Sequence, residues 1–247
     1  MPPLQQTGIP LYHQLVEIFS ERLASGEWAP GSLIPTELAL CAQYGVSRGP
    51  VRQALERLVQ EGRLTRKQGK GTTVLPPKIE SNLGGLYSFT HLIEQKGLRH
   101  TAQTLAFTTI TAAGSLARRL ALQAGAPVFE IRRLRLADGE PLILETIHIA
   151  TAVCPGLTAA DLAADSLYRL MTTRYDLTLA RAKQYFEPAL ADEYEAAHLQ
   201  LKPGAPVLLL HNLTLTPAAA PVVLSRAILR GDRVRYLVEL TLPLPVP

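Results

Sequence analysis

Residues 46–74, VSRGPVRQALERLVQEGRLTRKQGKGTTV, restrict the fold of this chain more than any other stretch. Apolar residues recur there at i, i+3, i+4, i+7 and i+8, which is the spacing of one buried face of a helix. These residues are Val51, Ala54, Leu55, Leu58 and Val59. Gly62 ends the pattern, and alternating residues around a GKG turn follow, as is typical of a two-stranded ribbon. The stretch predicts an amphipathic helix followed by a hairpin with a glycine-rich tip.

Two further helices are expected before this stretch. From Pro10 apolar residues recur at helical spacing as far as Gly26, which predicts a first helix. Thr36 is a suitable N-cap for a short second helix that ends at Gly45, and Ser47 is a suitable N-cap for the third. Helix, helix, turn, helix and hairpin together make a winged helix-turn-helix, which we place at residues 1–75.

Basic residues crowd into this predicted reading head, although the net charge of the whole chain is only +4. They are Arg48, Arg52, Arg57, Arg63, Arg66, Lys67 and Lys70. Arg48 and Arg52 lie on one flank of the third helix near its N-terminus, where phosphate is favoured and arginine can bind guanine in a major groove. Lys70, at the wing tip, can reach a minor groove or the DNA backbone. A merely solvated charged face is the alternative, but these charges coincide with the groove-facing parts of the motif, which favours double-stranded DNA as a partner.

The run IPTELALCAQYGVSRGPVRQALERLVQEGRLTRKQGKGTTV resembles the DNA-binding domain of GntR-type bacterial transcription regulators. The family pattern is L-P-S-E-x-x-L-A, then V-S-R-x-x-V-R-x-A-L-x-x-L, then G-x-G-T-x-V, and the resemblance covers roughly residues 10–75. It implies DNA contacts from the third helix and the wing at Ser47, Arg48, Arg52, Gly69, Lys70 and Gly71, with Thr36 and Gln53 near the DNA backbone. Leu38 stands where many members have arginine, which puts one base or phosphate contact in doubt.

A second domain is expected after a linker. Pro76, Pro77 and the run SNLGG mark the linker at residues 76–85, and residues 86–247 follow it. The strongest local signal there is PVFEIRRLRLADGEPLILETIHIA, in which two alternating segments flank a DG turn. Three more alternating segments lie near the C-terminus, and helices are expected between the strands. This order predicts an α+β fold, an antiparallel sheet with helices on one side.

Two arginines share one face of that hairpin with apolar residues. Arg133 and Arg135 alternate with Phe129 and Ile131, and a charged group buried without a partner costs several kcal/mol. A three-residue turn would place Glu145 opposite Arg133, whereas a two-residue turn would place Leu144 there. The arginines therefore need an anion, which is either this internal carboxylate or a phosphate or carboxylate of a ligand.

Residues 86–243 are similar to the effector domain (UTRA) of the HutC subfamily of GntR regulators, an α+β fold like that of chorismate lyase. The matching motifs are S-F-T at 88–90, R-x-R at 133–135, D-S-L-Y at 165–168 and R-G-D-R-x-R-Y at 230–236. The resemblance implies an effector site made of Ser88, Thr90, Arg133, Arg135, Glu145, Ser166, Tyr168 and Tyr236. In relatives that bind sugar phosphates, the positions of Thr90, Arg133, Arg135 and Ser166 hold the acidic group. Val223, Leu229 and His148 depart from the residues usual in sugar-binding relatives, so we expect a small anionic metabolite, with a phosphorylated one as a candidate, rather than an amino-sugar phosphate.

The expected function is that of a metabolite-responsive transcription regulator. We expect a homodimeric repressor that binds a palindromic operator and is released by its effector. Two alternatives stay open, which are an enzyme of chorismate-lyase-like fold and a constitutive DNA-binding protein whose arginine pair is structural. The enzyme is disfavoured because HExxH, GxSxG and Walker motifs are absent from the sequence, so no catalytic residue is assigned.

Other partners are not expected. Cys41 and Cys154 form no CxxC spacing, and no metal or cofactor is expected. No apolar run approaches the roughly 18 residues of a membrane span, and the first residues resemble no export signal. We therefore expect a cytoplasmic protein without membrane contact.

Overall fold

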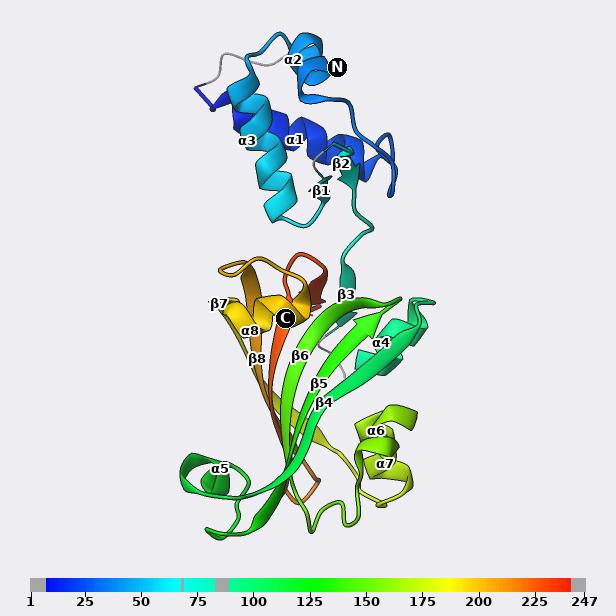
Figure 1. The fold of residues 1–247 in the computed structure, drawn as a ribbon, viewed down its shortest axis with the longest axis vertical. Helices are drawn as coiled ribbons and strands as arrows, with labels where there is room; N and C mark the ends of the chain where they lie inside the picture. Colours follow the sequence, from blue (N-terminus) through cyan, green and yellow to red (C-terminus); the bar gives the residue numbers. More distant parts are fainter. Residues whose placement is uncertain (1–7, 68, 83–88, 241–247) are drawn as a thin grey trace, which may run out of the picture. The chain divides into compact units, whose positions relative to one another are not determined.

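The computed structural model describes residues 8–67, 69–82 and 89–240, which form two compact units (Figure 1). The N-terminal unit comprises the residues up to 78 together with 231–233, and the C-terminal unit comprises 79–230 together with the residues after 233. Within the described residues, no helix is long and apolar enough to cross a membrane.

The N-terminal unit has three helices and a two-stranded antiparallel wing. They are α1 (Leu11–Ala24), α2 (Glu37–Tyr44), α3 (Arg48–Gln60), β1 (Leu64–Lys67) and β2 (Gly71–Val74). The Thr36 hydroxyl accepts a hydrogen bond from the Ala39 N–H and so caps α2, while Gly45, with φ of +65°, ends it in the left-handed conformation that glycine adopts readily. The predicted winged helix-turn-helix is confirmed.

The apolar stripe of α3 holds this unit together. Val51, Leu55 and Leu58 are buried against Leu15 and Phe19 of α1, in one cluster with residues of α2 and the wing. Burying side chains of this size stabilises the unit by about 1.5–3 kcal/mol each. The opposite flank of α3 carries its charged residues and stays in solvent.

The C-terminal unit is built on a six-stranded antiparallel sheet in the order β4-β5-β6-β9-β8-β7. Its strands are β4 (His100–Thr111), β5 (Pro127–Ala137), β6 (Glu140–Ala150), β7 (Arg181–Leu190), β8 (Pro206–Leu215) and β9 (Pro221–Arg230). Its helices are α4 (Phe89–Gln95), α5 (Gly114–Arg119), α6 (Ala159–Ala164), α7 (Leu167–Thr173) and α8 (Glu193–Leu199). The predicted α+β class is confirmed.

Helices cover both faces of this sheet and not one face as expected from the sequence (Figure 1). On one face, which we call the site face, Ile131 and Ile147 pack against Leu167 and Met171 of α7. On the opposite face, residues of β5, β6 and β9 pack against α8, while others pack against α5. The reason is that even-numbered positions of β5 and β6, such as Leu134, are apolar as well and also need cover.

Part of the predicted linker forms a strand. β3 (Ile79–Asn82) pairs in parallel with β10 (Val234–Leu237), and Ile79 and Val234 are buried in one apolar cluster. The sequence signal for a linker came from prolines and glycines, which do not report this long-range pairing. Residues 83–85 of the predicted linker lie outside the described residues.

The β5–β6 hairpin shows which residue lies opposite Arg133, Glu145 or Leu144, a question that the sequence left open because it depends on the length of the turn. Its turn has two residues, Asp138 and Gly139, with φ of +47° and +80°, as an Asp-Gly hairpin turn requires. The register then shifts by one residue next to Leu142, where Leu136 pairs with Pro141 and Arg135 pairs with Ile143. Glu145 consequently lies opposite Arg133 although the turn is short.

Candidate functional site

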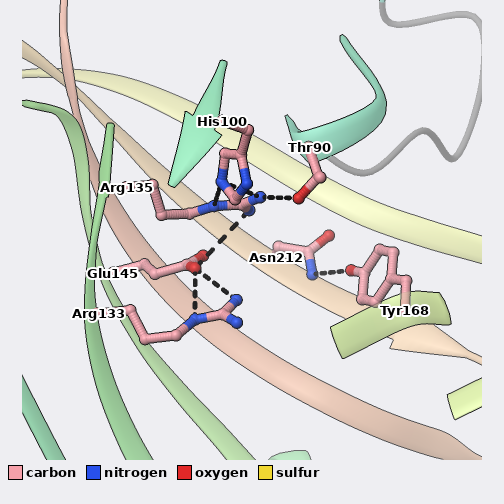
Figure 2. A network of polar contacts seen from close by, with 7 residues as sticks. All are labelled: Thr90, His100, Arg133, Arg135, Glu145, Tyr168 and Asn212. Atoms are coloured by element: carbon pink, nitrogen blue, oxygen red, sulfur yellow. Dashed lines mark hydrogen bonds and ion pairs between the residues drawn. The ribbon is translucent and has the colours of Figure 1, made fainter. Parts of the chain in front are cut away.

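A buried ion-pair cluster occupies the site face between β5 and β6. Nε and Nη2 of Arg133 donate hydrogen bonds to Oε1 of Glu145 at 3.0 and 2.6 Å. Nη1 of Arg135 lies 3.7 Å from the same carboxylate oxygen. Figure 2 shows Glu145 lying between the two guanidinium groups. Relative exposures of 4%, 8% and 9% for Arg133, Arg135 and Glu145 place all three charges away from bulk water.

Neutral groups surround Arg135 on its other sides. Its Nη2 donates to Oγ1 of Thr90 on α4 at 2.7 Å, and its Nε donates to Nε2 of His100 at 3.4 Å (Figure 2). The guanidinium carbon lies 4.8 Å from the ring centre of Phe89, a cation–π contact. The predicted residues Thr90 and Arg135 are thus brought together, and His100 joins them.

The charges of the cluster do not cancel. Burial lowers the pKa of Arg135 to about 10, which still leaves it charged at pH 7. Burial opposes ionisation of Glu145, but the guanidinium groups of Arg133 and Arg135 hold its pKa below the usual value. Burial, followed by the charges of Arg135 and Arg133, lowers the pKa of His100 to about 4, so this ring is neutral at pH 7. Two cations and one anion leave a net charge of one positive unit in a buried site.

A second polar network adjoins the cluster on the side of β8. The Tyr168 phenol, from α7, and Oγ1 of Thr214 form a hydrogen bond of 2.8 Å. Nδ2 of Asn212 donates to Thr214 at 3.1 Å and to Tyr168 at 3.4 Å, and its Oδ1 accepts from Gln184 of β7 at 3.2 Å. Burial raises the pKa of Tyr168, so the phenol remains a neutral donor and acceptor.

Tyr236 and Ser166 differ in their relation to the cluster. Burial raises the pKa of Tyr236 to about 12. The charge of Arg135 opposes this rise and the charge of Glu145 adds to it, so the phenol is close enough to interact electrostatically with both. The Ser166 hydroxyl caps α7 by accepting from the Arg169 N–H, and within the described residues no hydrogen bond joins it to the arginines. Ser88 lies outside the described residues.

Sequence reasoning missed His100 and Asn212 and misplaced His148. His148 was compared with effector-site positions of sugar-binding relatives, but it pairs with Glu130 at 3.1 Å on the opposite face, because its position in β6 differs by an odd number from that of Glu145. Asn212 lies on β8, two strands from Glu145, and no local pattern marks it. Val223 and Leu229 are each 1% exposed and belong to apolar clusters of the site face, as their apolar character suggested.

In the N-terminal unit, the residues predicted to read DNA gather at the start of α3. Ser47 is its N-cap and Arg48 its first residue, and both are exposed. The side chain of Arg52 is 65% exposed, and its Nε donates to Glu56 at 2.9 Å on the same helix. Gln53 follows and is also exposed.

The wing places further predicted residues in solvent. Gly69 and Gly71 have φ of +74° and +90°, and Lys70 between them is exposed. A side chain at Gly71 would also approach Leu33 to 3.1 Å, so both the backbone and the space favour glycine here. Thr36 has its hydroxyl engaged in capping α2.

Three of the other basic residues of the stretch, Arg57, Arg63 and Arg66, have partners within the unit. Arg57 pairs with Glu61 at 2.8 Å, and Arg66 forms an ion pair with Glu37. Nη2 of Arg63 donates to the Ser20 carbonyl at 3.0 Å and joins the end of α3 to α1. Arg63 therefore makes a structural contact within the unit.

The cluster and the polar network contain hydrogen-bond donors, but the described residues hold no group of three or more histidine, cysteine or acidic side chains that could bind a metal ion. Guanidinium, hydroxyl and phenol groups that converge at a buried positive site can bind a phosphate or carboxylate through charge-assisted hydrogen bonds.

Two family models match the chain in separate segments. The model described as bacterial regulatory proteins, gntR family, matches residues 11–74, and the model described as UTRA domain matches residues 95–235. The second match contains the Arg133–Glu145 cluster, and the first contains α1 to the wing.

Individual proteins are similar over nearly the whole chain. The HTH-type transcriptional repressor NagR of Bacillus subtilis is 33% identical over 94% of this chain and 96% of its own length. A histidine utilization repressor of Pseudomonas putida is 29% identical over 92% of this chain and 90% of its own. The crystal structure of PhnF from Mycobacterium smegmatis has a TM-score of 0.65 at 29% identity and covers 92% of this chain and 98% of that one.

Proposed function

Because this chain belongs to the gntR family of bacterial regulatory proteins and carries a UTRA domain, we propose that it is a metabolite-responsive repressor of transcription. Its N-terminal unit binds operator DNA, and its C-terminal unit binds a small anionic effector that releases the DNA. Relatives named transcriptional repressor and histidine utilization repressor support repression as the direction of control. A protein of this role works in the cytoplasm, where its operator is.

The observation that carries the effector proposal is the uncompensated positive charge at Arg133, Arg135 and Glu145. An isolated buried charge is costly, and an anion that enters the site removes this cost while it gains charge-assisted hydrogen bonds. Thr90 and the phenols of Tyr168 and Tyr236 supply neutral partners for the rest of the ligand. We assign a phosphate or carboxylate group to the arginine side and a small polar body to the side of Asn212.

The DNA-binding proposal rests on the exposed groups at the start of α3 and on the wing. Ser47, Arg48, Arg52 and Gln53 present donors beside a helix N-terminus, where phosphate is favoured, and Lys70 extends from the wing. We propose that the protein binds as a homodimer to a palindromic operator, with half-sites about one helical turn apart.

The two sites are proposed to act through one coupling free energy. Effector binding changes how the segment 76–85 holds two reading heads, and this changes operator affinity. If the protein were a constitutive DNA-binding protein, the arginine cluster would be purely structural, and the Arg133–Glu145 hydrogen bonds support this alternative. These bonds, however, leave Arg135 without an ionised hydrogen-bond partner among the described residues. An enzyme of the same fold would leave the DNA-binding unit without a role.

A pair of matched variants tests the proposal. Arg52→Ala should weaken operator binding about ten- to a hundredfold in fluorescence anisotropy, because a base-reading arginine contributes about 1–3 kcal/mol. Arg57→Ala is the control, since Arg57 lies on the same helix with the same kind of i,i+4 glutamate partner and similar exposure. Normal operator binding by Arg52→Ala over a range of salt would refute the assignment of the reading helix.

The effector half is tested by thermal shift with inorganic phosphate, phosphorylated sugars and small carboxylates. A ligand that stabilises the protein should lose its effect in Arg135→Ala, which leaves the neutral Arg133–Glu145 pair in place. Arg132→Ala, an exposed position on the same strand but the opposite face, should respond like the unchanged protein. Equal shifts in all three proteins would place the anion elsewhere.

A further inference from the structure

β7 is an edge strand of the six-stranded sheet, and its outer side is unpaired in the described part of the chain. The N–H of Ala191 donates to the Ala205 carbonyl at 2.9 Å, so the N–H groups of odd-numbered residues point toward β8. Pro188 agrees with this, because a proline fits a strand where its missing N–H would point away from the neighbour. The backbone groups of Ala182, Gln184 and Phe186 therefore point outward, and such a row of groups is a template for pairing with another chain.

Large apolar side chains are exposed beside this open edge. Tyr185 and Leu190 on β7 are 63% and 69% exposed, and Tyr194 on the adjacent α8 is 48% exposed. Within the described residues, the other edge strand, β4, carries no exposed large apolar side chain. Lys183 and Glu187 are exposed on either side of Tyr185 and share its face, which is the face opposite the effector site. The edge thus combines unpaired backbone, an aromatic centre and two opposite charges.

We propose that β7 pairs antiparallel with β7 of a second copy of this chain, with Tyr185 on the two-fold axis. In this register Lys183 of each copy faces Glu187 of the other, so two opposite-charge cross-strand pairs form. Gln184 and Phe186 of one copy exchange backbone hydrogen bonds with Phe186 and Gln184 of the other. The Pro188 carbonyl can still accept from Ala182 of the other copy. A register centred on Gln184 would instead place Lys183 opposite Tyr185 and lose both lysine–glutamate pairs.

This interface would lie one residue from the polar network of the effector site. Gln184 donates its side-chain amide to Asn212 at 3.2 Å, and the ring of Phe186 lies 4.6 Å from that of Tyr236. Both residues also carry the outward backbone groups of β7. A ligand that shifts Asn212 or Tyr236 would therefore act on the strand that joins the two copies. The inference rests on the proposed homodimer and names its interface.

Charge reversal tests the register in the full chain without DNA. Lys183→Glu and Glu187→Lys each place like charges opposite one another in both pairs, so each should weaken the dimer about 5- to 100-fold in sedimentation equilibrium. An equimolar mixture of these two variants should form a heterodimer near the original affinity, because both pairs are again opposite in sign. Arg181→Glu is the control, since Arg181 faces Ala189 in this register and its charge change equals that of Lys183→Glu.

Cysteine crosslinking tests the position of the axis. Tyr185→Cys should form a disulfide-linked dimer with diamide, which takes up the two electrons and two protons released by the thiols, because residues in a pair of this kind have Cα atoms about 4.5 Å apart. Leu190→Cys is equally exposed on the same strand but lies far from its own copy in this register, so it should not crosslink. The unchanged chain reports any background from Cys41 and Cys154.

The outcomes separate the interface from the proposed function. If the chain is a dimer whose affinity none of the charge variants changes, and Tyr185→Cys does not crosslink, the β7 interface is wrong while the dimeric repressor stands. If the unchanged chain stays monomeric at all concentrations, the homodimer itself is wrong. Anion binding measured by thermal shift is independent of both results.

Discussion

Arg135 is a buried cation whose hydrogen bonds go to neutral groups. Glu145 gives its hydrogen bonds to Arg133 and approaches Arg135 only to 3.7 Å, while the direct partners of Arg135 are a hydroxyl and a neutral imidazole. Burial lowers the pKa of Arg135 to about 10, yet leaves it protonated under physiological conditions. The cluster therefore carries a net positive charge, which is the physical basis for the proposed binding of an anion.

Replacement of the central carboxylate should make stability depend on an added anion. Glu145→Gln leaves two buried guanidinium groups without a charged partner, which should lower the free energy of unfolding by about 3–5 kcal/mol. Inorganic phosphate should recover more of the melting temperature in this variant than in the unchanged protein. Glu130 forms half-buried ion pairs on the opposite face, and Glu130→Gln should lower the free energy of unfolding by only about 1 kcal/mol or less. If phosphate stabilises neither protein, the cluster does not bind this anion.

His100 predicts a pH dependence of stability. Burial, followed by the charges of Arg135 and Arg133, lowers its pKa to about 4 from an ordinary value of 6.5. Between pH 4 and pH 6.5 the unfolded chain binds a proton at His100 that the folded chain does not. The contribution of His100 to the free energy of unfolding therefore has its full value above pH 6.5 and decreases as the pH falls toward 4. Urea unfolding at several pH values should show a shallower decline for His100→Asn than for the unchanged protein. Parallel declines would contradict the assigned burial of the imidazole.

At the scale of elements, α3 and the wing offer different groups to the proposed DNA interface. Arg48 and Arg52 lie at the end of α3 where its N–H groups are free, whereas Arg57 lies near the other end and Arg63 follows the helix and is bonded to α1. Arg66 forms an ion pair with Glu37, whereas Lys67 and Lys70 are exposed on the wing. In the proposed interface the wing would contribute chiefly charge, and α3 would contribute hydrogen-bond donors that can discriminate bases.

Lys70→Ala should weaken binding to all DNA sequences by a similar factor. Removing one ion pair between lysine and phosphate should reduce the slope of log affinity against log salt concentration by about one unit. Lys96→Ala removes an exposed lysine of the C-terminal unit and should leave the slope unchanged. Anisotropy titrations at several salt concentrations, with operator and with unrelated DNA, measure both effects. An unchanged slope for Lys70→Ala would remove the wing tip from the interface.

In the β5–β6 hairpin, the extra residue Leu142 determines which side chains lie opposite the arginines. Without the register shift next to Leu142, the two-residue turn would place Leu144 opposite Arg133 and turn Glu145 toward the α8 face. Both arginines would then be buried without a carboxylate. The shift thus determines that the cluster carries one net positive charge and not two.

At the scale of the whole molecule, effector and operator should be linked by reciprocity. The factor by which a saturating effector lowers operator affinity must equal the factor by which saturating operator lowers effector affinity. Anisotropy with labelled operator and calorimetry with the effector measure the two factors. In Arg135→Ala the operator affinity should be normal and insensitive to the effector. Release of Arg135→Ala by the same effector concentration as the unchanged protein would place the controlling site elsewhere.

Much of the architecture could be predicted because it depends on local patterns in the sequence. The helix spacing of Val51 to Leu58, the cap of α2 by Thr36 and the Asp-Gly turn each depend on residues near one another in sequence. The shared face of Arg133 and Arg135 follows from the two-residue period of a strand. These local rules determined the winged helix-turn-helix, the α+β class and the need for an anion at the arginine pair.

Only the tertiary structure decided which groups meet these arginines. Three features depend on pairings between segments that are distant in sequence: the ring of His100 beside Arg135, the network around Asn212 and the strand at Ile79–Asn82. The open edge of β7 likewise follows from the strand order. The physical reason is that periodicity tells which face a side chain takes, whereas charge balance and burial depend on what is packed against that face.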